Sequence, residues 1–86
     1  MKKDEVAKAL LAERQKAYQT TFLNTVGQTV LQDLMTFCRA SETTMTSDAR
    51  LSAALEGRRE VWLRIQNHLQ LDIETLYGIQ TGKVRL

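Results

Sequence analysis

Apolar residues recur every three or four positions along most of the chain, and this spacing predicts α-helices. The longest pattern lies within residues 48–69, where alternating steps of four and three keep the side chains on one face of a helix. One position of this seam is occupied by a charged residue, Arg58. The apolar members of the seam are Leu51, Leu55, Trp62, Ile65 and Leu69.

A long amphipathic helix is predicted at about residues 4–23, with Tyr18 and Phe22 on its apolar side. Its first turns carry less apolar area than its last turns, so we expect residues 1–8 to fray or to need a partner.

A second helix is predicted at about residues 26–38. Thr25 and Gln28 fit a reciprocal capping arrangement at its start. Its apolar stripe, which we expect in the core, consists of Val30, Leu31, Leu34, Met35, Phe37 and Cys38.

Residues 39–48 lack periodicity and predict a surface connection that ends in a Ser47 or Asp48 cap. The third helix then covers about residues 48–69. Asp72 is positioned to cap a short fourth helix at 72–79, and a basic tail follows at 80–86.

The composition agrees with an all-α fold, because the chain of 86 residues has no proline and four glycines. This length fits one small domain, residues 1–86. The predicted fold is a small antiparallel three-helix bundle with a long N-terminal helix and a short fourth C-terminal helix. Tyr18 and Phe22 join the stripe of the second helix and the seam of the third in its predicted core.

Gly57 interrupts the third helix beside Ala54 and Val61, which together form a strip of small residues. A glycine inside a helix costs roughly 1 kcal/mol relative to alanine. We therefore expect a second helix to pass close to this strip.

Arg58 needs an anionic partner if its seam is buried, and Asp33 on the second helix is the candidate for a structural ion pair. Under this hypothesis Asp33→Ala strands the arginine and destabilises the fold strongly. The alternative is that Arg58, Arg59 and Arg64 contact a protein partner or DNA. Two further cations that could make such contacts are Lys83 and Arg85 in the tail.

No catalytic constellation or metal site is predicted, since one histidine and one cysteine cannot supply four zinc ligands. His68 is expected to be solvated or satisfied in the core, and Cys38 to act as a small hydrophobic residue. Trp62 is interpreted as core, with a binding anchor as the alternative. We expect no cofactor, no small-molecule substrate and no membrane span.

Several short motifs resemble a family of small helical tailed-phage structural proteins named after a virion protein of a Bordetella podophage. The resemblance runs from about Tyr18 to Tyr77. Its most specific pieces are Val30–Leu34 followed by Phe37 and Cys38, and the Glu56–Arg59 turn. The chain lacks the proline often found after the threonine cap and carries Trp62 where smaller residues are common.

This resemblance implies a virion protein, made in the host cytoplasm, whose partners are other phage structural proteins, copies of itself or packaged DNA. We therefore interpret the chain as a component that acts by protein–protein assembly and not as an enzyme. The alternative is a small phage DNA-binding or regulatory protein. A net charge of +2 gives that alternative weak support.

Overall fold

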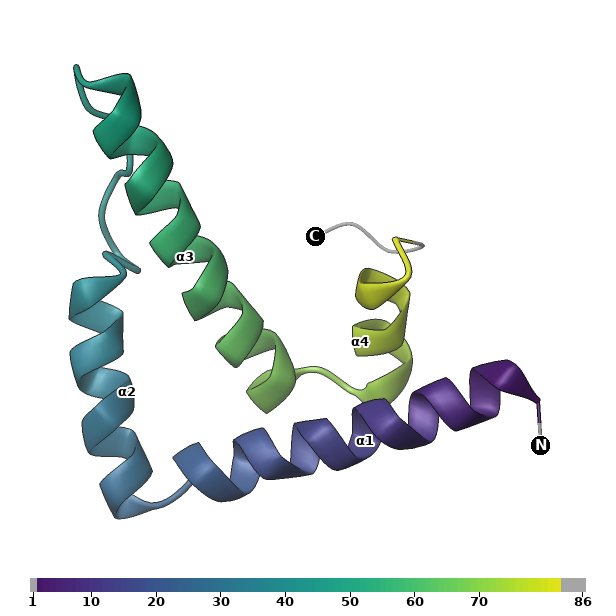
Figure 1. Cartoon of the computed structure of the whole chain (residues 1–86). Coiled ribbons are helices and arrows are strands. Elements are labelled where there is room, and N and C mark those ends of the chain that lie inside the picture. Colours follow the sequence, from purple (N-terminus) through teal and green to yellow (C-terminus); the bar gives the residue numbers. More distant parts are fainter. Residues whose placement is uncertain (1, 83–86) are drawn as a thin grey trace.

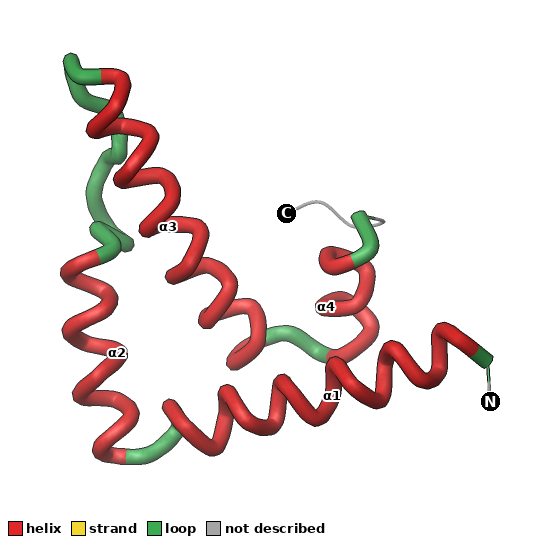
Figure 2. Tube along the Cα trace, in the orientation of Figure 1, coloured by secondary structure: helices red, strands yellow, loops and turns green. Residues whose placement is uncertain are grey.

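Four α-helices joined by turns make up residues 2–82, the part of the chain that the computed structural model describes. They are α1 (Lys3–Phe22), α2 (Thr25–Phe37), α3 (Ala49–Gln70) and α4 (Ile73–Gln80), and no strand occurs in this part of the chain (Figures 1 and 2). The all-helical prediction is confirmed, with a long first helix and a short fourth one.

The start of α2 differs from the prediction by one residue. Asn24, not Thr25, is the N-cap, and its side-chain oxygen accepts from the amide of Gly27 at 2.8 Å. Gln28 donates to the carbonyl of Phe22 at 2.8 Å, so it ties α2 to the end of α1. Asn24 satisfies the same free amides that a threonine cap would satisfy, and asparagine is at least as good an N-cap.

The caps of the two later helices are confirmed. The side chain of Asp48 accepts from the amides of Arg50 and Leu51 at the start of α3. The side chain of Asp72 accepts from the amide of Thr75 at 2.7 Å at the start of α4. The hydrogen bonds from the backbone amide and side chain of Thr75 favour the carboxylate and lower the pKa of Asp72.

The helices form one flat layer, with extents of 51 × 32 × 15 Å. In Figure 1, α2 and α3 run in opposite directions, α1 crosses their lower ends, and α4 folds back against α1. The radius of gyration is 15.1 Å, against about 12 Å for a compact domain of this length. The predicted three-helix bundle is therefore not confirmed, because α1 lies across α2 and α3 and not alongside them.

This open layer buries few large side chains. The buried hydrophobic residues of the described chain are Leu11, Leu31, Cys38, Leu55, Ile65 and Leu76. The remaining predicted core residues include five that are half-buried: Tyr18, Phe22, Leu34, Trp62 and Leu69.

Three residues expected in the core are exposed instead: Val30 at 46%, Phe37 at 55% and Leu51 at 47%. Their place in the core is corrected. A layer one helix thick covers only the sides of each helix that face a neighbour, so residues on its open sides stay in contact with water.

The connection between α2 and α3 is fixed to α3. Arg39 adopts a left-handed conformation with φ of 51°, and the amide of Ala40 donates back to the carbonyl of Met35 at 3.1 Å, which closes α2. The buried hydroxyl of Thr44 hydrogen-bonds the carboxylate of Glu56.

Candidate functional site

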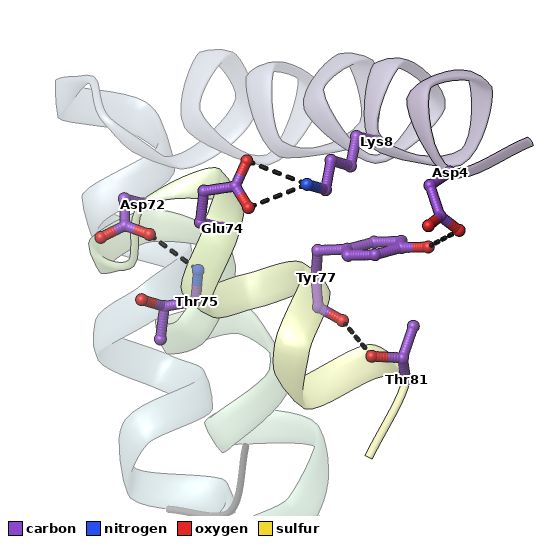
Figure 3. A network of polar contacts seen from close by, with 7 residues as sticks. All are labelled: Asp4, Lys8, Asp72, Glu74, Thr75, Tyr77 and Thr81. Atoms are coloured by element: carbon purple, nitrogen blue, oxygen red, sulfur yellow. Dashed lines mark hydrogen bonds and ion pairs between the residues drawn. The ribbon is translucent and has the colours of Figure 1, made fainter. Parts of the chain in front are cut away.

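The first turns of α1 are held by α4 (Figure 3). Lys8 pairs with Glu74 at 2.9 Å and lies 5.2 Å from the centre of the Tyr77 ring, and the Tyr77 hydroxyl donates to Asp4 at 3.0 Å. The hydrogen bond to Glu74 raises the pKa of Lys8, and the hydrogen bond to Asp4 raises the pKa of Tyr77. Asp4 and Lys8 therefore contact α4 within the chain, while the expectation that residues 1–8 fray or need a partner stays a prediction.

A buried polar junction joins α1, α3 and α4 at His68, whose side chain is 0% exposed. Its ring stacks on Tyr18 of α1, with the two centroids 4.2 Å apart. Its Nε2 accepts from Nε of Arg14 at 3.1 Å, and its Nδ1 lies 2.8 Å from the carbonyl oxygen of Arg64. Arg14 also donates to Gln80 of α4 at 3.1 Å, so one arginine connects the three helices.

These contacts fix the protonation state of His68. The guanidinium of Arg14 can only donate, so Nε2 must be unprotonated and Nδ1 must carry the hydrogen that it donates to the Arg64 carbonyl. Burial lowers the pKa of His68, and the positive charges of Arg14 and Arg64 lower it further, against the opposing effect of the backbone hydrogen bond. Both ring nitrogens are occupied, so the arrangement positions helices and leaves no lone pair for a metal or a substrate proton.

Beside this junction lies a largely apolar hollow of about 380 Å³ between α1 and α3. Its polar members are Arg14, Thr21 and Arg64, and all three are exposed. Its other members are Ala17, Tyr18, Phe22, Val61 and Ile65.

Arg58 lies three positions before Val61 on α3, so it is next to the hollow on the surface of that helix. Val26, Val30, Asp33 and Phe37 follow one another in steps of four, three and four, so they share one face of α2, and all are exposed. The guanidinium carbon of Arg58 lies 4.4 Å from the centre of the Phe37 ring, which brings this face of α2 next to α3. We call the hollow, together with Val30, Asp33, Phe37 and Arg58, the open face.

The predicted ion pair between Arg58 and Asp33 is wrong within the described residues. Arg58 is exposed and packs on Phe37, and Asp33 is exposed on α2. Leu31 and Trp62 instead line a second hollow, of about 320 Å³, between the two helices. Within the seam, Trp62 therefore faces α2, whereas Arg58 lies at the surface. There its guanidinium is solvated and packs on an aromatic ring.

The expected close packing at Gly57 is also wrong. A Cβ atom at Gly57 would have no atom of the described residues within 4 Å, and both Ala54 and Val61 are exposed. The close approach occurs at Gly27, where a Cβ atom would lie 2.5 Å from Cα of Phe22. A two-residue connection between α1 and α2 makes this corner tight.

Of the expected partner or DNA contacts, Arg59 donates to the carbonyl of Ala40 at 3.1 Å and so holds the α2–α3 connection. Arg64 is exposed at the margin of the hollow. Lys83 and Arg85 lie outside the described residues.

Comparison with protein families matches residues 18–78 to the Bbp19-like phage proteins, which is more than half of the chain. The chain belongs to this family. Comparison with curated proteins and with solved structures gives no match. The stretch that matches the Bbp19-like phage proteins contains α2, α3, the end of α1 and most of α4, and thus the whole hollow except Arg14 and Ala17.

In this Bbp19-like phage protein, His68 holds a position at the junction of three helices that helical spacing alone indicates only indirectly. It follows Val61 and Ile65 in steps of four and three, and this second stripe of α3 faces α1, whereas the seam through Trp62 faces α2. The spacing of Val61, Ile65 and His68 in the sequence therefore already indicates a second stripe on this helix.

None of the helices in residues 2–82 is long and apolar enough to span a membrane. The same residues contain no group of three His, Cys, Asp or Glu side chains placed to hold a metal ion.

Proposed function

We propose that the chain is a virion structural or virion-associated protein that acts by protein–protein assembly in the phage particle. The observation that carries this proposal is the open face, an exposed apolar surface on a layer one helix thick. Membership of the Bbp19-like phage proteins supports a phage context.

An exposed, continuous apolar surface is a feature of proteins that bind other macromolecules. Phe37 and Val61 are each more than half exposed. Covering these side chains with a partner removes apolar area from water at about 25 cal/mol per Å². Assembly thereby completes the core that the single layer leaves open.

We also propose that the chain is not an enzyme. The only histidine is buried with both ring nitrogens hydrogen-bonded, and the neighbouring groups are arginines and a backbone carbonyl. This arrangement supports a structural part for His68, since a general base needs a free lone pair near a substrate.

DNA binding, the alternative function, receives less support. Arg59 is engaged with the α2–α3 connection. That connection, residues 38–48, is longer than the turn of about 3–4 residues in a helix-turn-helix motif. The open face combines apolar side chains with three arginines and one aspartate, whereas DNA-binding surfaces are much more strongly positive.

Quantitative mass spectrometry of purified particles of the phage that encodes the chain tests the proposal. We expect the chain in the particles at a fixed copy number relative to the other virion proteins. Its absence from particles, combined with salt-sensitive binding to duplex DNA, would instead favour the regulatory alternative.

A further inference from the structure

We propose that a second copy of the chain covers the open face, in a two-fold dimer in which Asp33 of each copy pairs with Arg58 of the other. This inference rests on the proposed function and names the first partner in the assembly. Four observations support it: the exposed area, the shape of the face, its charges and its position in the layer.

The exposed area is larger than a monomer of this size needs. The chain exposes 6412 Å², against about 5,200 Å² for a compact protein of 9.8 kDa. The excess is about 1,200 Å², and a stable interface of standard size takes about 800 Å² from each partner. One dimer interface of standard size would therefore remove about two-thirds of this excess.

The shape of the face is suited to pairing with itself. Phe37 is 55% exposed, with the guanidinium of Arg58 against its ring, and the hollow beside Val61 is a largely apolar concavity of about 380 Å³. In a two-fold interface each contact occurs twice, with the partners exchanged. A single arrangement thus places each Phe37 ring against the hollow of the other copy.

One pair of charges on the face is also complementary to itself, although Arg14 and Arg64 add positive charge there. Asp33 and Arg58 are both exposed, are opposite in sign, and do not pair within one chain. Rotation about a two-fold axis brings the acidic side of one copy over the basic side of the other. Two symmetric ion pairs then flank the apolar contact and fix its register.

The open face belongs to a single layer of helices, and a second layer is the partner that would cover it. The layer is only 15 Å thick, so two layers stacked on their open faces create the second layer that a hydrophobic core requires. A partner with a different surface must match the apolar hollow and charges of both signs, whereas a second copy supplies all of these features.

The first test measures self-association of the full chain by sedimentation velocity over a range of concentrations. We expect a dimer for the wild type and at least an about tenfold loss of affinity for Val61→Glu, because the new carboxylate is tolerated in water but becomes buried in the dimer. The matched control is Leu63→Glu on the same helix. Leu63 is 45% exposed against 54% for Val61, and it lies in a hollow toward α4.

The control variant should dimerise like the wild type, within about twofold. Circular dichroism and a thermal melt of dilute protein show whether each variant is folded. A monomeric wild type, or folded Val61→Glu and Leu63→Glu variants that dimerise equally, would overturn the proposal.

The second test exchanges the charges. Asp33→Arg and Arg58→Asp should each dimerise more weakly than the wild type, because each places like charges in contact across the interface. Mixing the two single variants should restore the dimer, since the heterodimer has an arginine opposite an aspartate at both contacts. If the mixture stays as weakly associated as either variant alone, the pairing of Asp33 with Arg58 of the other copy is refuted.

The two proposals can fail separately. A wild-type chain that is monomeric in solution but present in particles refutes the dimer and leaves the virion proposal standing. A chain that dimerises in solution but is absent from particles refutes the virion proposal and leaves the dimer standing.

Discussion

The two internal glycines of α2 and α3 predict opposite effects for the same substitution. Gly57→Ala adds a methyl group to an exposed helix position with no atom of the described residues within 4 Å of it. Alanine is favoured over glycine in a helix by about 1 kcal/mol, so the variant should be more stable by that amount. For a domain of this length the melting temperature should rise by about 4–8 °C.

Gly27→Ala gains the same helix propensity but loses more from crowding. Its Cβ would lie 2.5 Å from Cα and 2.8 Å from the carbonyl carbon of Phe22, and it would also meet the carbonyl oxygen of Thr21. These are backbone atoms that cannot move aside without shifting α1, so the cost should lie near the upper end of overpacking, about 3 kcal/mol. The net loss is about 2 kcal/mol, which lowers the melting temperature by about 8–16 °C.

Thermal melts followed by circular dichroism measure both effects, with all proteins at one concentration because association raises the melting temperature. The wild type is the common reference. A stabilised Gly27→Ala, or a Gly57→Ala that melts well below the wild type, would refute the assignment of the close helix approach to the α1–α2 corner.

Three further predictions concern single side chains. His68 has a lowered pKa, so the unfolded chain binds more protons than the folded one, and the free energy of unfolding should fall as the pH drops below about 6.5. Thermal melts between about pH 7 and 5 should show this decline. A melting temperature that falls as steeply with pH in His68→Gln as in the wild type would contradict it. Arg39→Gly should raise the free energy of unfolding in urea by up to about 1 kcal/mol, because residue 39 adopts a left-handed conformation with φ of 51°, which glycine adopts without strain. The ion pair that the substitution removes, with Glu42, is exposed and contributes little. A destabilised variant would count against strain at residue 39. Asp33→Ala should change the stability of dilute monomer by less than about 0.5 kcal/mol, and a large loss would restore the ion pair within one chain.

The sequence was sufficient to predict the helices, because helix periodicity and capping are local properties. Asp72 caps α4 as predicted, Asp48 is one of the two residues proposed to cap α3, and the error at α2 amounts to the choice between Asn24 and its neighbour Thr25. Caps can be found from sequence because a cap and the amides that it binds lie within three residues of each other.

The arrangement of the helices could not be predicted in the same way. α3 has two apolar stripes, one toward α2 through Trp62 and one toward α1 through Ile65 and His68, and the pattern does not tell which helix each stripe meets. The prediction used one seam and placed Arg58 inside a bundle. In the flat layer that position is at the surface, because the side of α3 that carries Arg58 is not covered by another helix of residues 2–82, and the arginine needs no buried anionic partner there.

The candidate site was predicted only in its chemical type. Binding through apolar helix faces was expected, but the open face contains Phe37 and Val30, which were assigned to the core. A binding surface and a core have the same composition, and only the packing of the other helices decides which residues stay exposed.

The most direct test of the account is the amount of the chain in purified phage particles that carry Val61→Glu or Leu63→Glu, measured by quantitative mass spectrometry against the major virion proteins. We predict wild-type levels for Leu63→Glu and a strong loss for Val61→Glu, because only the second change places a charge on the open face. Equal amounts of a folded Val61→Glu chain and the wild-type chain in the particles would contradict the claim that this face directs assembly.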